Sequence, residues 1–551
     1  MHRPWLDQYP AGVEPRIDMD RYASVAAVLE ESCQRFAPHC AFENLGSTLS
    51  YADLDRHSRH FAAYLQSELG LKKGDRLALM MPNCLQHVVA LFAGLRSGLV
   101  IVSVNPLYTA RELEFQLQDS GARAIVIFEN FACTLEKVED SVPVEHIVTT
   151  RMGDMLGPVK GAVTNFFARR VKKMVPEWDL PDPISFSDAL TQGEGLTLAP
   201  VALTHSDVAL LQYTGGTTGP ARGAVLSHGN LVANILQTMS WFSDSLEPER
   251  EIIVTALPIY HIFALMVNVL IFLHIGGRNL LITNPADMPA FVKELRRHRF
   301  TAITGVNTLF NGLLNTPGFE QIDFSALKFA VGGGSAIRKA VADRWQAATG
   351  QAIIEGYGLS ETSPVVTCNL LNSKDFNHSI GLPLPATEVV IRGEENQDLP
   401  EGETGELCVK GPQVMLGYWQ GNASDSDTFT TDGYLKTGDM ARMDESGFFY
   451  LVDRKKDVIL VSGFNVFPNE IEEVIASHEA VLEGAAVGVP DEKTGEAVKL
   501  FVVRKDEALT AEEVREHCRA HLTAYKVPKH IEFIQEIPKS NVGKVLRKEL
   551  R

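Results

Sequence analysis

The stretch that decides the fold runs from Leu211 to Gly223 and reads Leu-Gln-Tyr-Thr-Gly-Gly-Thr-Thr-Gly-Pro-Ala-Arg-Gly. It brings threonine hydroxyls, glycines and the cation of Arg222 close together in sequence. Glycines let backbone N–H groups approach phosphate oxygens, and hydroxyl groups add donors or reach a metal ion. The stretch therefore predicts a loop that wraps a polyphosphate. A Walker A loop requires G-x-x-x-x-G-K-[ST], which is not present here, so a different nucleotide chemistry is expected.

Length and charge limit the classes of protein that fit this chain. A chain of 551 residues is too long for a single core, and we expect two to four domains. It carries 51 Lys and Arg against 69 Asp and Glu, a net charge of −18. A general nucleic-acid binder is expected to be basic, so that class is disfavoured.

Cysteine usage and the N-terminal residues indicate the compartment. The seven cysteines form no C-x-x-C pair, and their odd number favours a reduced, cytoplasmic setting. The first residues have no apolar signal core, so we do not expect export. The apolar stretch 256–275 nearly reaches transmembrane length, but it contains Pro258, His261, Asn268 and His274. We interpret it as a buried helix.

Alternating β-rich and helical patterns fill the first three quarters of the chain. Segments 75–81, 124–128 and 251–255 read as strands, and 84–97 reads as an apolar helix. This alternation is typical of βαβ units and parallel sheets. We therefore predict an α/β fold with two βαβ-type subdomains.

The pattern changes after residue 387. Segment 387–451 is rich in Gly, Asp, Glu and Thr with short strands such as 406–410, which favours a small antiparallel barrel or sheet. The last hundred residues predict a small α+β unit, with a helix at 470–478 and strands at 483–489 and 500–504. We place the boundary at 454/455, giving an N-terminal domain 1–454 and a C-terminal domain 455–551.

Segment 163–175 is basic within an acidic protein. Its apolar residues fall near helical spacing, and Arg169, Arg170, Lys172 and Lys173 lie close together. A helix on a membrane surface is one interpretation. A solvated helix that covers the body of the protein is the other, and the sequence leaves both open.

Four further segments carry groups suited to a nucleotide. Gly332–Gly334 would let a flat base approach the backbone, and segment 355–362 offers an aromatic ring followed by a carboxylate. Asp439 is suited to ribose hydroxyls, and Lys544 lies beside a glycine near the C-terminus. Each segment alone also fits an ordinary loop, turn or solvated lysine.

Together, in this order, the five segments resemble the adenylate-forming superfamily of acyl-CoA synthetases, firefly luciferases and peptide-synthetase adenylation domains. The resemblance covers nearly the whole chain. Other segments are similar to bacterial long-chain fatty-acid–CoA ligases, namely 5–10, 104–108, 256–263, 304–310, 414–419 and 452–465.

The resemblance implies a reaction in two steps. The carboxylate of a long-chain fatty acid attacks the α-phosphorus of ATP, giving acyl-adenylate and pyrophosphate, and the thiol of CoA then displaces AMP. Such chemistry needs charge neutralisation and alignment more than covalent help. The resemblance also implies Mg²⁺, a homodimer and a cytoplasmic enzyme, with peripheral contact to membrane lipid as one interpretation of the basic segment.

The resemblance assigns roles to individual residues. Lys544, Glu361 and Thr214 would be catalytic, and Thr214 and Glu361 would bind Mg²⁺. Contacts to ATP or CoA are implied for Tyr213, Thr214, Gly215, Gly216, Thr217, Thr218, Gly219, Arg222, Gly223, Gly332, Gly333, Gly334, Glu355, Gly356, Tyr357, Gly358, Thr362, Asp439, Arg454, Lys456, Gly463 and Phe464.

The resemblance further implies a mobile C-terminal domain and an acyl tunnel. The C-terminal domain would turn about Lys456 between the two steps, bringing first Lys544 and then segment 461–465 to the reactants. Trp241 would gate the tunnel, while Val306, Asn307 and Phe310 would line it. His261 is a candidate at the junction of the acyl and pantetheine groups, and a structural histidine is the alternative.

One position departs from the family pattern. Arg222 stands where the family usually has lysine; it keeps the charge but is bulkier and planar. We expect a working site with altered affinity for ATP. Two other functions stay open on the sequence: a ligase for medium-chain or aryl acids, and a catalytically silent protein that binds acyl-adenylate.

Overall fold

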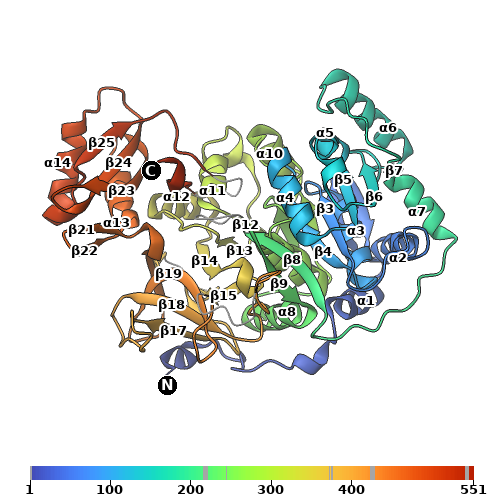
Figure 1. Cartoon of the computed structure of the whole chain (residues 1–551), viewed down its shortest axis with the longest axis horizontal. Coiled ribbons are helices and arrows are strands. Elements are labelled where there is room, and N and C mark those ends of the chain that lie inside the picture. The colour runs from blue at the N-terminus through green and yellow to red at the C-terminus, as the bar shows by residue number, and fades with distance from the viewer. Residues whose placement is uncertain are drawn as a thin grey trace.

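A computed structural model shows two large sheets side by side with a small sheet and a C-terminal unit at one end (Figure 1). It describes residues 3–214, 221–243, 245–371, 373, 376–421, 428–539 and 545–551. The chain begins near the small sheet, and the C-terminal unit lies at the end of the molecule opposite α6 (Figure 1).

The first large sheet runs in the order β16-β15-β14-β13-β12-β10-β11-β1-β2 among the described strands, and its central pairs are parallel. Its strands are β1 (Cys40–Asn44), β2 (Ser47–Ser50), β10 (Ile252–Thr255), β11 (Arg278–Leu281), β12 (Ala302–Gly305), β13 (Phe329–Gly332), β14 (Ile353–Gly358), β15 (Val365–Cys368) and β16 (Leu382–Pro383).

The second large sheet runs in the order β7-β6-β5-β3-β4-β8-β9, parallel except for the antiparallel hairpin of β8 and β9. Its strands are β3 (Arg76–Met80), β4 (Val100–Ser103), β5 (Ala124–Phe128), β6 (His146–Thr150), β7 (Ile184–Ser185), β8 (Val208–Thr214) and β9 (Arg222–Ser227).

Helices lie between and outside these sheets. The α-helices are α1 (Val25–Arg35), α2 (Tyr51–Ser67), α3 (Leu85–Arg96), α4 (Ala110–Ser120), α5 (Ala132–Glu136), α6 (Pro158–Phe166), α7 (Phe186–Glu194), α8 (His228–Phe242), α9 (Ile271–His274), α10 (Met288–Leu295), α11 (Asn307–Leu314), α12 (Lys339–Thr349), α13 (Pro468–Ala476) and α14 (Ala511–His521).

Alternation along the strands divides the core into layers. Ile253 of β10 packs into one apolar cluster with residues of α1, α2, α3, α8 and of the second sheet, whereas its neighbour Val254 packs with α10, α11 and α12. In β3, Leu77 faces the shared cluster, and Ala78 faces α4 and α5. Successive side chains of a strand point to opposite faces, so each sheet is covered on both sides.

The sequence-based elements agree closely with this fold. The strand predicted at 124–128 is β5, and those predicted at 75–81 and 251–255 are β3 and β10. The apolar helix predicted at 84–97 is α3. These buried parallel strands are continuous apolar runs, which is why they stand out in the sequence.

The apolar stretch 256–275 contains a buried helix, as predicted, which follows a turn at 256–261. It contains a π-helix, η6 (Ala264–Leu270), followed by α9, and the residues of η6 are buried. Asn268 is accommodated by hydrogen bonds to the Val254 carbonyl and the Thr255 hydroxyl. Among the described residues, no helix has both the length and the apolar character to cross a bilayer.

The basic segment differs from its predicted bounds. Its helix begins earlier, with Gly157 before Pro158 at the first turn of α6, and continues as the π-helix η5 (Phe167–Val171). Proline is favoured at the first helical position because its φ already suits a helix. The chain then leaves the helix, and Lys173 has a φ of 50°.

The last part of the chain forms two smaller sheets. An antiparallel sheet contains β17 (Glu388–Arg392), β18 (Gly405–Lys410), β19 (Leu435–Met443) and β20 (Phe449–Arg454). The C-terminal sheet contains β21 (Ile459–Val461), β22 (Phe464–Val466), β23 (Val481–Asp491), β24 (Gly495–Arg504) and β25 (His530–Phe533).

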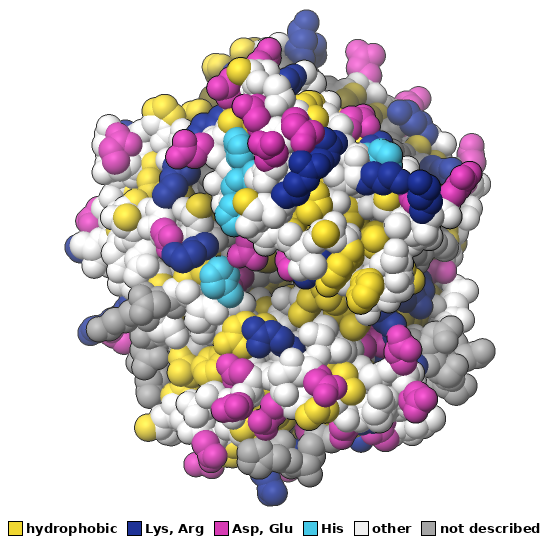
Figure 2. Space-filling view, turned by 90° about the vertical axis from the view of Figure 1, so that its left-hand side faces the viewer, with side chains coloured by type: hydrophobic (Ala, Val, Ile, Leu, Met, Phe, Trp, Pro, Cys, Tyr) yellow, Lys and Arg dark blue, Asp and Glu magenta, His cyan; other side chains and the backbone are white. Residues whose placement is uncertain are grey.

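The C-terminal sheet has its own apolar core. α13 and α14 pack on it through Ile471, Ile475, Val514 and Cys518. Figure 2 shows this end of the molecule, where acidic and basic side chains are interspersed and histidines gather. The unit is the small α+β part that the sequence predicted after the antiparallel sheet.

Candidate active site

Two of the predicted nucleotide segments, 332–334 and 355–362, lie on neighbouring strands of the first large sheet. β12, β13 and β14 are parallel and end at Gly305, Gly332 and Gly358. Val306 follows β12, and Gly333 and Gly334 follow β13. Ligands of α/β proteins bind in the crevice outside the carboxyl ends of parallel strands. The topology thus brings together segments that are distant in sequence.

Gly332 at the end of β13 and Gly333 after it are packed where side chains do not fit. A Cβ at Gly332 would lie 2.6 Å from the Ile337 side chain, and one at Gly333 would lie 3.1 Å from the Phe263 ring. Gly334 has a φ of 75°, which favours glycine. The protein's own packing therefore requires glycine at Gly332 and Gly333, and the predicted approach of a flat base stays a prediction.

Tyr357, Asp439 and Arg454 form a continuous chain of contacts. The buried Tyr357 hydroxyl donates to Asp439 Oδ2 at 2.7 Å, and Arg454 Nε lies 2.7 Å from Asp439 Oδ1. Burial, followed by the nearby Asp439 charge, raises the Tyr357 pKa well above its ordinary value, so the hydroxyl stays a donor. The Asp439 side chain is only 6% exposed and is held from two sides.

A second chain of contacts links Arg222 to Glu361. The Arg222 guanidinium carbon lies 3.8 Å from the centre of the Tyr418 ring. The Tyr418 hydroxyl donates to Glu361 Oε1 at 2.7 Å. The cation of the predicted phosphate loop and the predicted metal ligand therefore share one aromatic side chain.

The base of the predicted phosphate loop is fixed by β8 and β9. The Tyr213 hydroxyl donates to Asp119 Oδ2 at 2.5 Å, and Thr214 Oγ1 donates to the Arg222 carbonyl at 3.4 Å. Gly223 pairs with Tyr213, and a Cβ there would lie 3.1 Å from the Tyr213 ring. The loop residues Gly215, Gly216, Thr217, Thr218 and Gly219, and also Lys544, lie outside the described residues.

Four predicted nucleotide contacts lie in β14 or in the turn that follows it. The Glu355 carboxylate accepts from the Ile337 N–H at 2.9 Å, and burial raises its pKa to about 7. A Cβ on Gly358 would lie 2.0 Å from the Pro364 carbonyl oxygen, whereas one on Gly356 has ordinary contacts. The Thr362 hydroxyl donates to the Pro364 carbonyl at 2.5 Å. The Gly358 and Thr362 contacts shape the turn that carries Glu361, and the ligand roles of all four residues stay predictions.

The predicted acyl-site residues are spread between the edge and the core. Val306 lies 3.6 Å from the Cβ position of Gly334, and Asn307 Oδ1 accepts from the Arg338 N–H at 2.9 Å. Phe310 is fully buried and packs against Trp345 with ring centres 4.8 Å apart. His261 lies between β10 and η6, and its Nδ1 accepts from the Phe263 N–H.

Trp241 is buried, with 4% exposure, and its indole N–H donates to the Asn369 carbonyl at 3.2 Å. Tyr9 packs edge-on against it at 5.2 Å. These are the contacts of a core aromatic. The tunnel and its gate stay predictions.

The predicted hinge lies between two differently anchored residues. Lys455 Nζ is 2.8 Å from Glu406 of the antiparallel sheet, whereas Asp457 pairs with Arg551 at 2.9 Å in the C-terminal unit. The exposed Lys456 lies between them in η9 (Lys455–Asp457). Beyond it, Gly463 has a φ of 82° in the β21–β22 turn, and the exposed Phe464 stacks on Tyr525 at 4.8 Å.

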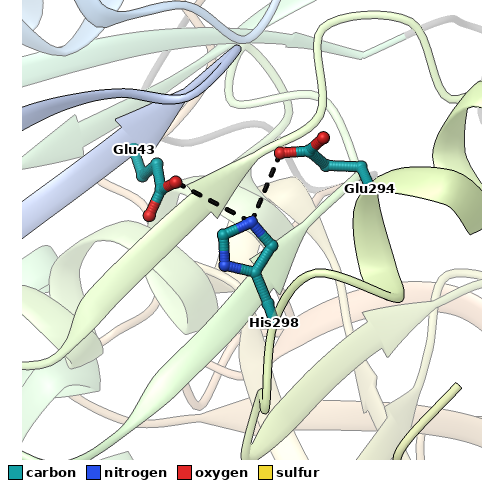
Figure 3. A group of neighbouring side chains, drawn as sticks. All are labelled: Glu43, Glu294 and His298. Atoms are coloured by element: carbon teal, nitrogen blue, oxygen red, sulfur yellow. Dashed lines mark hydrogen bonds and ion pairs between the residues drawn. The ribbon is translucent and has the colours of Figure 1, made fainter.

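A group able to hold a metal lies elsewhere, between β1 of the first sheet and the end of α10. His298 Nε2 is 3.7 Å from Glu43 and 3.3 Å from Glu294, with all three drawn in Figure 3. Arg278 already pairs with Glu43 at 3.2 Å, and Arg297 pairs with Glu294 at 2.9 Å. Because these cations balance the carboxylates, we interpret the group as an ion-pair network.

Residues 29–419 match the AMP-binding enzyme family, and residues 470–544 match the AMP-binding enzyme C-terminal domain. The chain belongs to the AMP-binding enzyme family. A Yersinia pestis protein named long-chain-fatty-acid–CoA ligase is 55% identical over 551 residues, 100% of this chain and 98% of the relative. A protein of the same name from Haemophilus influenzae is 50% identical over 554 residues, with the same shares covered.

Solved structures of the family share the fold. An anthranilate CoA ligase in complex with anthranoyl-AMP superposes with a TM-score of 0.83 over 96% of this chain and 97% of that one, at 24% identity. The likeness confirms the α/β architecture with a large N-terminal and a small C-terminal part. It says nothing about the substrate of this AMP-binding enzyme.

Two residues at the site were missed on the sequence. Tyr418 lies in segment 414–419, which was noted only for its similarity to long-chain fatty-acid–CoA ligases. No role was predicted for Asp119. The Asp119 carboxylate accepts a hydrogen bond from the Tyr213 hydroxyl. Its backbone carbonyl accepts another from the Trp419 indole N–H at 3.0 Å. Neither position has a spacing pattern that points to the loop, because both approach it only in the folded chain.

Proposed function

We propose that this chain is a long-chain fatty-acid–CoA ligase that forms AMP. Its similarity over the full length to long-chain-fatty-acid–CoA ligases is the observation that carries this proposal. ATP and CoA are its co-substrates. The fatty-acid carboxylate displaces pyrophosphate from ATP to give acyl-adenylate, and the CoA thiol then displaces AMP with loss of the thiol proton.

The contacts at the sheet edge support distinct tasks for this chain's residues. Gly332–Gly334 and Tyr357 would frame the adenine, and the constrained Asp439 carboxylate, with Arg454, would hold the ribose hydroxyls. The β8–β9 hairpin with Arg222 would grip the departing pyrophosphate. Such pre-positioned groups act without reorganisation during the reaction.

We also propose that Glu361 and Thr214 hold Mg²⁺. Oxygen ligands fit this cation, and the Glu361 carboxylate is already oriented by Tyr418, while Thr214 ends β8 beside the loop. A bound Mg²⁺ would supply neutralisation of phosphate charge. The carboxylate and hydroxyl of the chain supply the ligands.

Lys544 and the interdomain hinge complete the proposal. Lys544 would bridge the fatty-acid carboxylate and the α-phosphate, because a point charge suits a transition state with charge spread over several oxygens. The opposite anchoring of Lys455 and Asp457 supports a pivot at Lys456 and a domain boundary at 454/455.

A panel of acids tests the proposed substrate class. The purified protein would be mixed with ATP, Mg²⁺ and CoA, and pyrophosphate release and thiol consumption would be measured for palmitate, octanoate and benzoate. We expect palmitate to give the highest kcat/KM. Preference for octanoate or benzoate would favour the medium-chain or aryl alternative, and no pyrophosphate from any acid would favour the silent binding protein.

The α6–η5 surface supports peripheral contact with membrane lipid. Val159, Val163, Phe166, Phe167 and Val171 are all more than half exposed. Exposed apolar side chains in such number on one segment mark an interaction site. In Figure 1 the segment projects at the end of the molecule away from the C-terminal unit.

Cations flank these apolar side chains. Arg170, Lys172 and Lys173 are exposed, whereas Arg169 is held by Glu129 at 2.6 Å. In a protein with a net charge of −18, this basic surface is complementary to anionic headgroups. We therefore propose an anionic bilayer as its partner, with the enzyme otherwise in the cytoplasm.

Sedimentation with vesicles of phosphatidylglycerol and phosphatidylcholine tests this contact. Replacing Arg170, Lys172 and Lys173 by Gln is expected to release most of the bound protein. The matched control replaces the exposed Arg16, Lys493 and Lys505 by Gln, which gives the same net charge. Equal sedimentation of wild type and the first variant would contradict the proposal.

A homodimer is proposed from the family resemblance alone. Light scattering coupled to size-exclusion chromatography is expected to give twice the chain mass of 60.6 kDa. A monomer at micromolar concentration would contradict this.

A further inference from the structure

We infer that Tyr418 is a positioning residue that orients the Glu361 carboxylate and anchors Arg222 beside it. The inference deepens the proposed ligase function and rests on it. Its basis is a pair of contacts from one side chain: the Tyr418 ring lies under the Arg222 guanidinium at 3.8 Å, and its hydroxyl donates to Glu361 at 2.7 Å.

The backbone around Tyr418 is fixed on two sides. Met415 N–H donates to the Glu361 carbonyl at 2.8 Å. Segment 416–419 exchanges hydrogen bonds with β9: Leu416 N–H reaches the Val225 carbonyl at 3.0 Å, and Trp419 N–H reaches the Gly223 carbonyl at 2.7 Å. These bonds do not involve the Tyr418 side chain, so a change of that side chain leaves the backbone held in place.

The two contacts are chemically separable. A cation over an aromatic face is attracted by the ring, and phenylalanine offers the same face. The hydrogen bond to an ionised carboxylate needs the hydroxyl and belongs to the stronger class of hydrogen bonds. It engages Glu361 Oε1, and a carboxylate has further lone pairs with which to take a cation.

This separation defines two variants. Tyr418→Phe removes only the hydroxyl. The hydrogen bond that orients Glu361 is then lost, while the aromatic ring on which Arg222 stacks remains. Tyr418→Leu removes both. We expect Tyr418→Phe to raise the Mg²⁺ concentration for half-maximal pyrophosphate release roughly tenfold, with little change in the apparent KM for ATP at saturating Mg²⁺. Tyr418→Leu is expected to raise both quantities.

The chain offers a matched control. Tyr450 has the same surroundings away from the site, with Arg442 4.5 Å from its ring centre and its hydroxyl 3.0 Å from Asp444 Oδ2. Tyr450→Phe therefore removes an equivalent hydrogen bond. It is expected to keep the wild-type Mg²⁺ dependence, so general loss of a tyrosine–carboxylate bond cannot explain an effect at Tyr418.

A double-mutant cycle separates positioning through Glu361 from a merely structural role. The experiment measures pyrophosphate release from ATP and palmitate against Mg²⁺ for Tyr418→Phe, Glu361→Gln and the double variant. If Tyr418 acts through Glu361, the double variant has the Mg²⁺ dependence of Glu361→Gln. The inference would be overturned if the two single variants shifted the Mg²⁺ dependence independently, so that their effects multiplied in the double variant. An unchanged Mg²⁺ dependence in Tyr418→Phe would also overturn it.

Two readouts keep this inference distinct from the proposed function. Wild-type protein that releases no pyrophosphate would contradict the ligase itself. The second half-reaction, in which supplied palmitoyl-adenylate reacts with CoA, does not require pyrophosphate to leave and is expected to keep its rate in Tyr418→Phe. An equal fall in both half-reactions would indicate damage to the fold and would overturn the positioning role.

Discussion

The Tyr357 hydroxyl donates a 2.7 Å hydrogen bond to Asp439 Oδ2 across 82 residues of sequence. This bond joins the end of β14 in the large sheet to β19 in the antiparallel sheet. A residue proposed to face adenine thereby constrains the carboxylate proposed to face ribose. The two halves of a nucleoside would be recognised by side chains that hold each other.

Removing this hydrogen bond tests whether Tyr357 supports the contact that Asp439 is proposed to make with ATP. Tyr357→Phe keeps the ring but leaves Asp439 with one fewer donor, so we expect the apparent KM for ATP to rise about fivefold. Pyrophosphate release at saturating palmitate measures it. Tyr434→Phe is the control, since its hydroxyl donates to Glu388 at 2.8 Å within the antiparallel sheet. An unchanged KM in Tyr357→Phe would show that Asp439 needs no such support.

Glu355 makes stability depend on pH. Burial raises its folded-state pKa to about 7 from 4.5, so the protonated form stabilises the fold. That stabilisation is complete below pH 4.5 and is lost as pH rises through 7. Glu355→Gln keeps an acceptor for the Ile337 N–H without an ionisable proton. We expect the variant to gain up to about 3 kcal/mol over wild type between pH 5 and pH 8.

Calorimetric melting of both proteins at pH 5 and pH 8 measures this gain. The exposed Glu68→Gln serves as control, because its carboxyl has no comparable burial. A constant difference in melting temperature between Glu355→Gln and wild type at the two pH values would contradict the raised pKa.

Arg222→Lys restores the residue that the family pattern favours. Lysine keeps the charge but loses the planar group that stacks 3.8 Å from Tyr418. We expect the apparent KM for ATP to change about threefold, with the second half-reaction unaffected. If the KM for ATP stays at the wild-type value, Arg222 merely substitutes for lysine and the idea of altered affinity is wrong.

Lys544→Ala separates the two half-reactions. The lysine is proposed to act only while the carboxylate attacks ATP, so we expect pyrophosphate release to fall by at least a hundredfold. Supplied palmitoyl-adenylate should still react with CoA at nearly the wild-type rate. Lys539→Ala is a nearby control, since Lys539 pairs with Glu483 at the base of the same segment. Equal loss of both steps in Lys544→Ala would refute the division of labour.

Local pattern predicted much of the fold because buried parallel strands leave an unbroken apolar signal. β5 matches its predicted bounds, and β3, β10 and α3 differ only at their ends. The bounds of α6 were harder to predict because Gly157 and Pro158 start the helix before the basic residues that drew attention to it. Helix ends depend on one or two capping residues, whereas strand cores depend on many.

The sequence by itself determined the chemistry: the loop composition around Tyr213–Gly223, the glycines after β13 and the order of the motifs indicated an adenylate-forming enzyme. Only the tertiary structure decided which side chains act together. Tyr357 reaches Asp439, and Tyr418 joins Arg222 to Glu361, because elements of three different sheets pack together in the folded chain. Motifs are local and leave residue-type signatures, but such contacts arise from the packing of distant segments and leave no spacing in the chain.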